Sequence, residues 1–247
     1  MPRNARWFES GTALHVIQRG NDRSPCFRSV EDYRSYLEWL SFYGQAYDCP
    51  LHAYVLMTNH VHLLMTAGSH EGPSRLMQAL GRRYVRHFNQ KHSRTGTLWE
   101  GRFKAHPVQS DHHLLCLYRY IETNPVRAGM VGNAAAYRWS SFGRNGLGAS
   151  DAMLSDHPLY AALAESKDAR HAAYRALFQE ELDQETLDAI RAAAQCGRPW
   201  GSPAFVTALS QSLSLPLARK NGRPKKATDL ETKDLFAADQ VSAKTLL

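Results

Sequence analysis

The chain has 247 residues, of which 43% are hydrophobic and 21% charged, and these values are ordinary for a soluble globular protein. Its net charge of +7 and isoelectric point near 9.3 favour a polyanionic partner, with nucleic acid ahead of a membrane, although ordinary surface charge is the alternative. The sequence shows no apolar run of about 18 residues, no signal-peptide core and no C-x-x-C pair, which predicts a cytoplasmic protein with reduced thiols.

The first part of the chain predicts alternating strands and helices. Residues 13–20 are rich in β-forming side chains and end at a Gly-Asn-Asp turn signal, so we expect a first strand there. Ser29 is a candidate N-cap for a helix over residues 29–47, in which apolar side chains recur at helical spacing. Residues 51–67 break at a Thr-Asn pair (58–59) and predict two strands joined by a tight turn.

A second helix, a fourth strand and a third helix follow. Residues 73–92 carry apolar side chains on one face and predict an amphipathic helix. Residues 96–109 predict the fourth strand. Asp111 can cap a helix over residues 111–125 that ends at Pro125.

The predicted order is β-α-β-β-α-β followed by a further helix, which is the split β-α-β, ferredoxin-like arrangement. We therefore expect an α+β fold with an antiparallel sheet and helices packed on one face. The composition changes after the main domain, because Ala-rich helical segments are followed by a basic stretch punctuated by Pro and Gly. We predict a main domain over residues 1–150, a helical C-terminal extension over 151–215 and a basic, flexible tail over 216–247.

His60 and His62 stand two residues apart in the apolar stretch TNHVHLLM (58–65). Strand side chains alternate between faces, so both imidazoles project to the same side and could chelate one divalent ion. A pair of hydrogen-bonded histidines at a strand end is an equally good interpretation, because H-x-H is common. A metal site also needs a third ligand and a chemical task.

The helix predicted over residues 111–125 offers both a third ligand and a chemical task. At 100° per residue, Tyr118 lies in the middle of the apolar stripe, so we predict that it packs in the core. Tyr120 lies at the edge of the stripe, with Asn124 one turn later on the same edge. A phenol facing the histidines could attack a phosphodiester, while an ion polarises the phosphate and Asn124 completes the coordination. Tyr118 and Tyr120 lie on opposite faces, which disfavours a two-tyrosine mechanism.

Basic and aromatic side chains predict a path for DNA. Arginine holds phosphates bidentately, and both arginine and aromatic rings stack on unpaired bases, although core filling is the alternative for the rings. The candidates in the main domain are Arg19, Arg23, Trp99, Arg102, Phe103, Lys104 and Arg127. In the tail, a DNA-binding arm is favoured over a solvated tail. Its basic residues are Arg219, Lys220, Arg223, Lys225 and Lys226.

Four segments between residues 12 and 143 together resemble one family. They are HVIQRGNDRSPCF, YVLMTNHVHLLM, GTLWEGRF and YIETNPVRAGMV. The resemblance is to the REP-associated tyrosine transposases, single-tyrosine members of the HUH nuclease superfamily that are related to the insertion-sequence-200-like transposases. It implies that residues 1–150 form an HUH catalytic domain.

The resemblance also implies roles for individual residues. His60 and His62 fit the metal ligands, Tyr120 fits the nucleophile, and Asn124 falls near the metal, which would be Mg²⁺ or Mn²⁺. The implied activity is nicking of single-stranded DNA beside a REP-like hairpin, with a 5′-phosphotyrosine intermediate and a free 3′-hydroxyl that can later re-attack. The C-terminal extension favours a monomer over a homodimer.

Three other interpretations stay open. A domesticated hairpin-binding protein with vestigial catalysis would carry the same residues. A histidine-metal hydrolase of small phosphoesters would leave the excess of positive charge unexplained. A relaxase or replication initiator shares the site chemistry, but these proteins usually order the histidines and tyrosine differently or use paired tyrosines.

Overall fold

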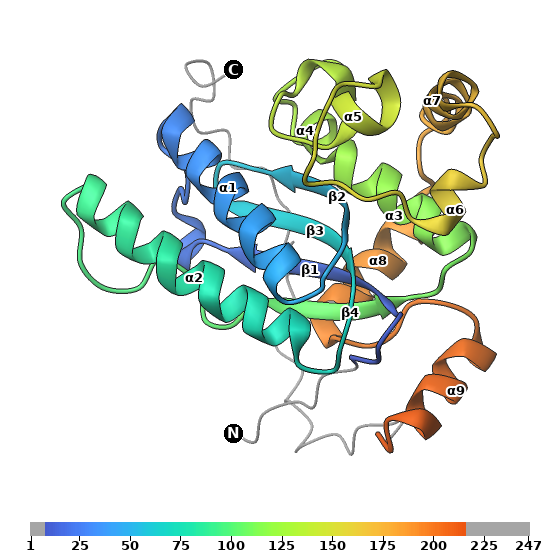
Figure 1. Cartoon of the computed structure of the whole chain (residues 1–247), viewed down its shortest axis with the longest axis horizontal. Coiled ribbons are helices and arrows are strands. Elements are labelled where there is room, and N and C mark those ends of the chain that lie inside the picture. The colour runs from blue at the N-terminus through green and yellow to red at the C-terminus, as the bar shows by residue number, and fades with distance from the viewer. Residues whose placement is uncertain (1–7, 216–247) are drawn as a thin grey trace, which may run out of the picture.

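The computed structural model describes residues 8–215, and a four-stranded sheet lies at its centre (Figure 1). The strands are β1 (Ala13–Arg19), β2 (Leu51–Leu56), β3 (His60–Thr66) and β4 (Lys104–Val108). They lie in the order β2-β3-β1-β4, and every neighbouring pair is antiparallel. This order confirms the predicted ferredoxin-like, α+β fold.

The predicted tail, residues 216–247, lies outside the described residues. Its candidate DNA-binding residues therefore lie outside them as well, namely Arg219, Lys220, Arg223, Lys225 and Lys226.

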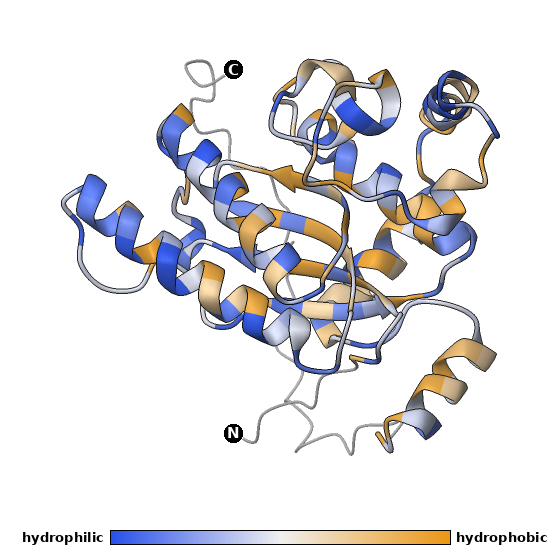
Figure 2. Ribbon diagram, in the orientation of Figure 1, coloured by the Kyte–Doolittle hydropathy of each residue, from blue (hydrophilic) through white to orange (hydrophobic). Residues whose placement is uncertain are grey.

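Helices cover both faces of the sheet, so the prediction of helices on one face was wrong. On one face α1 (Val30–Ala46) and α2 (Gly72–Lys91) pack against each other (Figure 1). On the other face α3 (His112–Glu122) contacts β2 and β3, and α8 (Gln184–Cys196) contacts β4. Because both faces of the sheet are covered, β2 is buried along its whole length. Figure 2 shows that the central strands are largely hydrophobic.

The fourth strand is shorter than the predicted range 96–109. Gly96 and Gly101 have φ angles of 82° and 76°, and this left-handed backbone interrupts an extended strand. β4 therefore begins at Lys104. Arg102 and Phe103, which the predicted range 96–109 placed on the strand, therefore lie before it.

The helix predicted over residues 111–125 is divided into two. Asp111 caps α3, because its Oδ1 accepts a hydrogen bond from the His113 backbone N at 2.8 Å. A short helix α4 (Asn124–Arg127) follows, with Pro125 in its first turn. Proline has no backbone N–H, and residues in the first turn of a helix need no partner for that group within the helix. Pro125 therefore fits the start of α4 and does not only end α3.

The rest of the described chain is mainly helical. Its helices are η1 (Asn21–Arg23), η2 (Ala134–Ala136), α5 (Phe142–Leu147), α6 (Pro158–Ala161), α7 (Lys167–Ala176) and α9 (Pro203–Ser212). Within residues 8–215, no helix combines the length and apolar character that a membrane span needs.

α3 is buried on two sides, and this corrects the prediction for its tyrosines. Tyr118 is buried, but against the C-terminal helices: its ring centroid lies 6.1 Å from that of Tyr160 and 5.8 Å from that of Tyr174. Tyr120, predicted at the edge of the apolar stripe, is 1% exposed and faces the sheet. A helix that packs on both a sheet and other helices carries two apolar stripes, so one stripe does not identify its partner.

Glu122 connects α3 to α5 and α7 through a fully buried carboxylate. Its Oε1 accepts hydrogen bonds from Ser141 Oγ at 2.5 Å and Asn145 Nδ2 at 3.0 Å, and its Oε2 accepts one from the Tyr174 hydroxyl at 2.7 Å. These donors favour the ionised form, but burial outweighs them and raises the pKa of Glu122 to about 7.

We expect the free energy of unfolding to depend less on pH in the variant Glu122→Gln than in the wild type. Because burial raises the folded-state pKa of Glu122 to about 7, above its unfolded value of 4.5, this group favours folding most at low pH. That contribution is lost as the pH rises through about 7. Urea unfolding should be measured below pH 4.5 and above pH 7. Between these two conditions the free energy of unfolding of the wild type should fall by on the order of 2 kcal/mol more than that of the variant. Parallel pH profiles for the two proteins would contradict the expectation.

Candidate metal site and nucleophile

β3 places His60 and His62 on the face of the sheet that α3 covers. Their ring centroids lie 5.0 Å apart, and the ring planes make an angle of 81°. Across the β1–β3 pairing, His60 stands opposite Arg19 and His62 opposite Ile17. The structure therefore brings both imidazoles to one place, as strand alternation predicts.

His60 is held in a defined orientation by its neighbour in the chain. Its Nδ1 lies 2.7 Å from Asn59 Oδ1, and because an amide oxygen only accepts, Nδ1 carries the proton. Nε2 then carries the lone pair. This atom is buried and has no hydrogen-bond partner among residues 8–215. A buried imidazole nitrogen with this tautomer fits a metal ligand.

His62 is oriented by a residue that the sequence did not single out. Its Nδ1 lies 2.8 Å from Nε2 of His15 on β1, and the two rings stack with centroids 5.0 Å apart. Because Nδ1 of His62 is engaged by His15, Nε2 is the candidate metal-binding nitrogen of this ring. Nε2 is therefore the candidate ligand atom in both histidines.

His106 on β4 completes a cluster of buried histidines. It stands opposite His15 in the β1–β4 pairing, with ring centroids 4.9 Å apart. Burial lowers the pKa of His60 to about 4 and that of His106 to about 3, and it holds the pKa values of His15 and His62 well below the ordinary range. The imidazoles are therefore neutral near pH 7, which is the form that binds metal ions.

Tyr120 lies against this cluster from the α3 side. Its ring centroid is 5.7 Å from that of His62 and 6.0 Å from that of His15, both in edge-to-face geometry. The Arg127 guanidinium lies 4.4 Å from the centre of the Tyr120 ring and donates a hydrogen bond to the Tyr120 carbonyl at 2.7 Å. Arg127, predicted to contact DNA, therefore also holds the end of α3 in place.

Asn124 begins α4, four residues after Tyr120. Its side chain is buried, and its Nδ2 has no hydrogen-bond partner among the described residues. A buried carboxamide of this kind is compatible with the predicted role as a metal ligand through its oxygen. That role stays a prediction.

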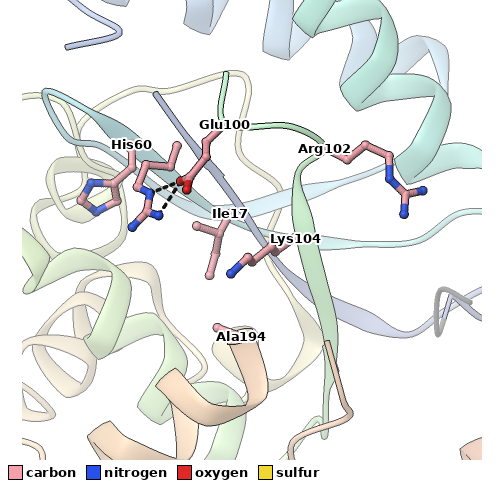
Figure 3. Close-up of a pocket in the computed structure, with 7 residues that line it drawn as sticks. Ile17, His60, Glu100, Arg102, Lys104 and Ala194 are labelled. Atoms are coloured by element: carbon pink, nitrogen blue, oxygen red, sulfur yellow. Dashed lines mark hydrogen bonds and ion pairs between the residues drawn. The ribbon is translucent and has the colours of Figure 1, made fainter. Parts of the chain in front are cut away.

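Beside His60 the structure contains a pocket with three basic side chains (Figure 3). It is lined by Ile17, Arg19, His60, Glu100, Arg102, Lys104 and Ala194. Arg19 forms an ion pair with Glu100, with Nε and Oε2 2.5 Å apart. Lys104 and Ile17 point into the space above Ala194, whereas Arg102 extends away from it. Of the predicted DNA contacts, Arg19 and Lys104 thus lie together at one pocket.

The other predicted DNA contacts have different surroundings. Trp99 is 6% exposed, and its ring lies 5.9 Å from that of Tyr84, so it fills the core and offers no surface to a base. Phe103 is half-buried and stacks on Phe8. Arg23 is half-buried in η1, and its backbone carbonyl accepts a hydrogen bond from Asn59 Nδ2 at 3.2 Å.

A second group of metal-ligating side chains lies at the start of α3, away from the predicted ligands. In Asp111, His112 and His113, one ligand atom from each lies within 4.8 Å of the others. Asp111 Oδ1 already accepts hydrogen bonds from the backbone N and the Nδ1 of His113. Helix capping accounts for this arrangement.

Residues 9–124 match the family model described as "Transposase IS200 like". This part of the chain is similar to the IS200-like transposases. The matched region begins before β1 and ends at Asn124, so it contains all four strands and the histidine and tyrosine cluster. A comparison with curated proteins found no match.

Two solved structures are similar to this chain. One is a REP-associated tyrosine transposase bound to a REP hairpin, with 19% identity, a TM-score of 0.49, and coverage of 64% of this chain and 96% of the other. The second is a protein assigned as a transposase from Deinococcus radiodurans R1, with 22% identity, a TM-score of 0.35, and coverage of 49% and 97%.

We expect His15→Leu to weaken metal binding while leaving both proposed ligands in place. Leucine fills similar space but cannot hydrogen-bond His62 Nδ1, so the tautomer and orientation of His62 are no longer fixed. Calorimetric titration with Mn²⁺ should show affinity lower by about 10- to 100-fold. His15→Gln, which retains a polar end, should recover part of the loss. Equal affinity for the wild type and the leucine variant would contradict the role of His15.

Proposed function

We propose that the chain is a REP-associated transposase that nicks single-stranded DNA beside a hairpin and transfers the cut strand. The observation that carries this proposal is the position of the Tyr120 ring, 5.7 Å from His62 and next to the His60 and His62 pair. A potential nucleophile and a potential metal site therefore lie together in the domain matched by the family.

His60, His62 and Asn124 would hold a divalent ion, Mg²⁺ or Mn²⁺. When bound, the ion polarises the scissile phosphate and offsets the negative charge that develops on it. The buried Nε2 of His60 and the hydrogen bonds made by the Nδ1 atoms of both histidines support this assignment.

Tyr120 is the proposed nucleophile. Its phenolic oxygen attacks the phosphorus, the bond from phosphorus to the 3′-oxygen breaks, and the phenolic proton is balanced by the proton gained at the released 3′-hydroxyl. The products are a 5′-phosphotyrosine and a free 3′-hydroxyl. The covalent bond conserves the energy of the phosphodiester, so a second 3′-hydroxyl can reverse the step without ATP.

Positive charge around the pocket would hold the DNA. Arg19 and Lys104 line the pocket beside His60, and Arg127 lies beside Tyr120. Salt-dependent phosphate contacts of this kind bind DNA without reading its sequence. A REP-like hairpin is the substrate that we propose, on the basis of the resemblance in sequence.

The proposed organisation follows the sequence. Residues 1–150 form the catalytic domain, residues 151–215 the helical extension and residues 216–247 a basic tail that binds DNA. Tyr120 faces the histidines of its own chain, which supports a site that is complete in a monomer. We place the protein in the cytoplasm with the nucleoid.

The proposal is tested by incubating the protein with labelled hairpin DNA that carries single-stranded flanks, with Mn²⁺ and with EDTA. Cleavage and a covalent protein–DNA adduct are expected with Mn²⁺ and not with EDTA. Binding without cleavage in Mn²⁺ would instead indicate a hairpin-binding protein with vestigial catalysis.

A further inference from the structure

The helix α2 carries positive charge that the proposed chemistry does not use. Its sequence from Gly72 to Lys91 contains no Asp or Glu. Its basic residues are Arg75, Arg82, Arg83, Arg86 and Lys91. Protein surfaces ordinarily mix charges of both signs, so a helix that carries only one sign indicates a site for a partner of the opposite sign.

Three of these arginines form a stripe on the side of α2 that faces the solvent. At 100° per residue, Arg75, Arg82 and Arg86 lie within about 40° of one another, and they span about 16 Å along the helix axis. All three are exposed. The apolar residues that pack in the core lie on the opposite side of the helix, and they are Leu76, Leu80, Tyr84 and Phe88. We call the three residues the arginine stripe.

Contacts within the fold do not account for the arginine stripe. Arg75 pairs with Glu71 at 3.0 Å, but this ion pair is exposed and contributes little to stability. Within residues 8–215, neither Arg82 nor Arg86 forms an ion pair. These two arginines are four residues apart on one helix, so they repel each other. A bound polyanion would relieve this repulsion.

The other two basic residues of α2 differ, because they have partners in the fold. The Arg83 guanidinium lies 5.2 Å from the centre of the Trp39 ring. Lys91 Nζ lies 3.1 Å from Oδ1 of the buried Asp32. Arg83 and Lys91 therefore connect α2 to α1 and are not part of the stripe.

The arginine stripe fits the phosphate backbone of paired DNA. Guanidinium groups bind phosphates, and duplex DNA presents them densely, with one negative charge per about 1.7 Å of its axis. Unpaired bases, in contrast, are commonly held by aromatic side chains on which they stack. The positions on α2 next to the stripe contain no aromatic residue, and they are Gln78, Ala79, Asn89 and Gln90. Positive charge without a stacking surface favours a paired stem over a single strand.

α2 is joined to the candidate active site by the segment that precedes β4. The Trp99 ring lies 5.9 Å from the ring of Tyr84 on α2. The next residue, Glu100, donates its backbone N–H to the Arg19 carbonyl at 2.8 Å and lines the pocket with Arg19 and His60. The stripe thus lies on an element that is fixed relative to the pocket, as the stem and flank of one hairpin require.

We propose that Arg75, Arg82 and Arg86 bind the phosphate backbone of the paired stem of a DNA hairpin. This inference rests on the proposed function, because it takes a hairpin as the substrate. It assigns the stem to a surface separate from the cluster of histidines and Tyr120. Phosphate contacts do not read the bases, so the stripe holds stems of different sequence equally well.

The test is the double variant Arg82→Gln with Arg86→Gln. The probes are two fluorescent hairpins whose stems differ in sequence and an unpaired oligonucleotide of the same length, and equilibrium binding is measured over a range of salt concentrations. For both hairpins, the slope of log affinity against log salt should be smaller by about two than in the wild type, about one for each lost contact. The unpaired oligonucleotide should bind both proteins with the same slope.

Arg34→Gln is the matched control for the single variant Arg82→Gln. Arg34 is an exposed arginine on α1, and it stands between Glu31 and Glu38 at helical spacing, so its charge is balanced locally. Both single variants lower the net charge by one. Arg82→Gln should reduce the salt slope with hairpins by about one, whereas Arg34→Gln should leave it unchanged. Thermal unfolding checks that every variant folds.

The outcomes separate this inference from the proposed function. Equal salt slopes for the double variant and the wild type, or an equal reduction with the unpaired oligonucleotide, would overturn the stem contact and leave the nicking proposal standing. A slope reduced only with hairpins, in a protein that cuts none of them, would support the stem contact and overturn the nicking proposal. Failure of the wild type to bind any hairpin would overturn both.

Discussion

Replacing Tyr120 by phenylalanine is expected to abolish cleavage and the covalent adduct, with a rate loss on the order of 10⁴-fold or more. The ring of Tyr120 is buried against His62 and His15, so phenylalanine should preserve the packing and remove only the hydroxyl oxygen. Without that oxygen the proposed nucleophile is missing beside the histidine pair. Hairpin binding should be retained, because the basic residues at the pocket are unchanged.

Tyr118→Phe is the matched control for this experiment. Tyr118 is equally buried on the same helix but faces Tyr160 and Tyr174, away from the histidines. The Tyr118→Phe variant should cleave hairpin DNA at a rate close to that of the wild type. If the Tyr120 variant still formed the adduct, Tyr120 would not be the nucleophile. If the Tyr118 variant lost it instead, the two tyrosines would have been assigned the wrong way round.

Replacing His62 by alanine is expected to remove Mn²⁺ binding and metal-dependent cleavage together. Loss of a hydrogen bond to a metal ligand already costs about 10- to 100-fold in affinity, so loss of the ligand itself should cost at least that much. Calorimetric titration with Mn²⁺ measures the binding directly and does not depend on activity. EDTA should have the same effect on cleavage by the wild type.

His112→Ala is the control that distinguishes the two possible metal sites. His112 is exposed and belongs to the group at the start of α3 with Asp111 and His113. The variant should bind Mn²⁺ as tightly as the wild type. Loss of binding in His112→Ala, with binding retained in His62→Ala, would place the metal at the start of α3 and contradict the proposed site.

The sequence was sufficient to predict the parts of the site that follow from local periodicity. Strand alternation puts His60 and His62 on one face, and the change from strand to helix spacing separates Tyr120 from Tyr118. The strand order follows from the alternation of elements, because few topologies connect β-α-β-β-α-β. These features depend on neighbours in the chain.

Features that depend on contacts between distant segments could not be predicted in this way. His15 becomes a partner of His62 only through the β1–β3 pairing, although a histidine inside the apolar stretch ALHVIQR was a usable signal. For Trp99 the sequence leaves both a stacking surface and core filling open, because nothing local shows that Tyr36 and Tyr84 surround it. The contribution of Ala194 to the pocket requires α8 to fold back onto β4.

The central claim is that a tyrosine on α3 and two histidines on β3 form one catalytic site. The most direct measurement is peptide mapping by mass spectrometry of the adduct formed with hairpin DNA in Mn²⁺. The mass of a 5′-phosphorylated nucleotide should be found on Tyr120. A nucleotide attached to any other residue, or DNA cleaved with no adduct at all, would contradict the claim.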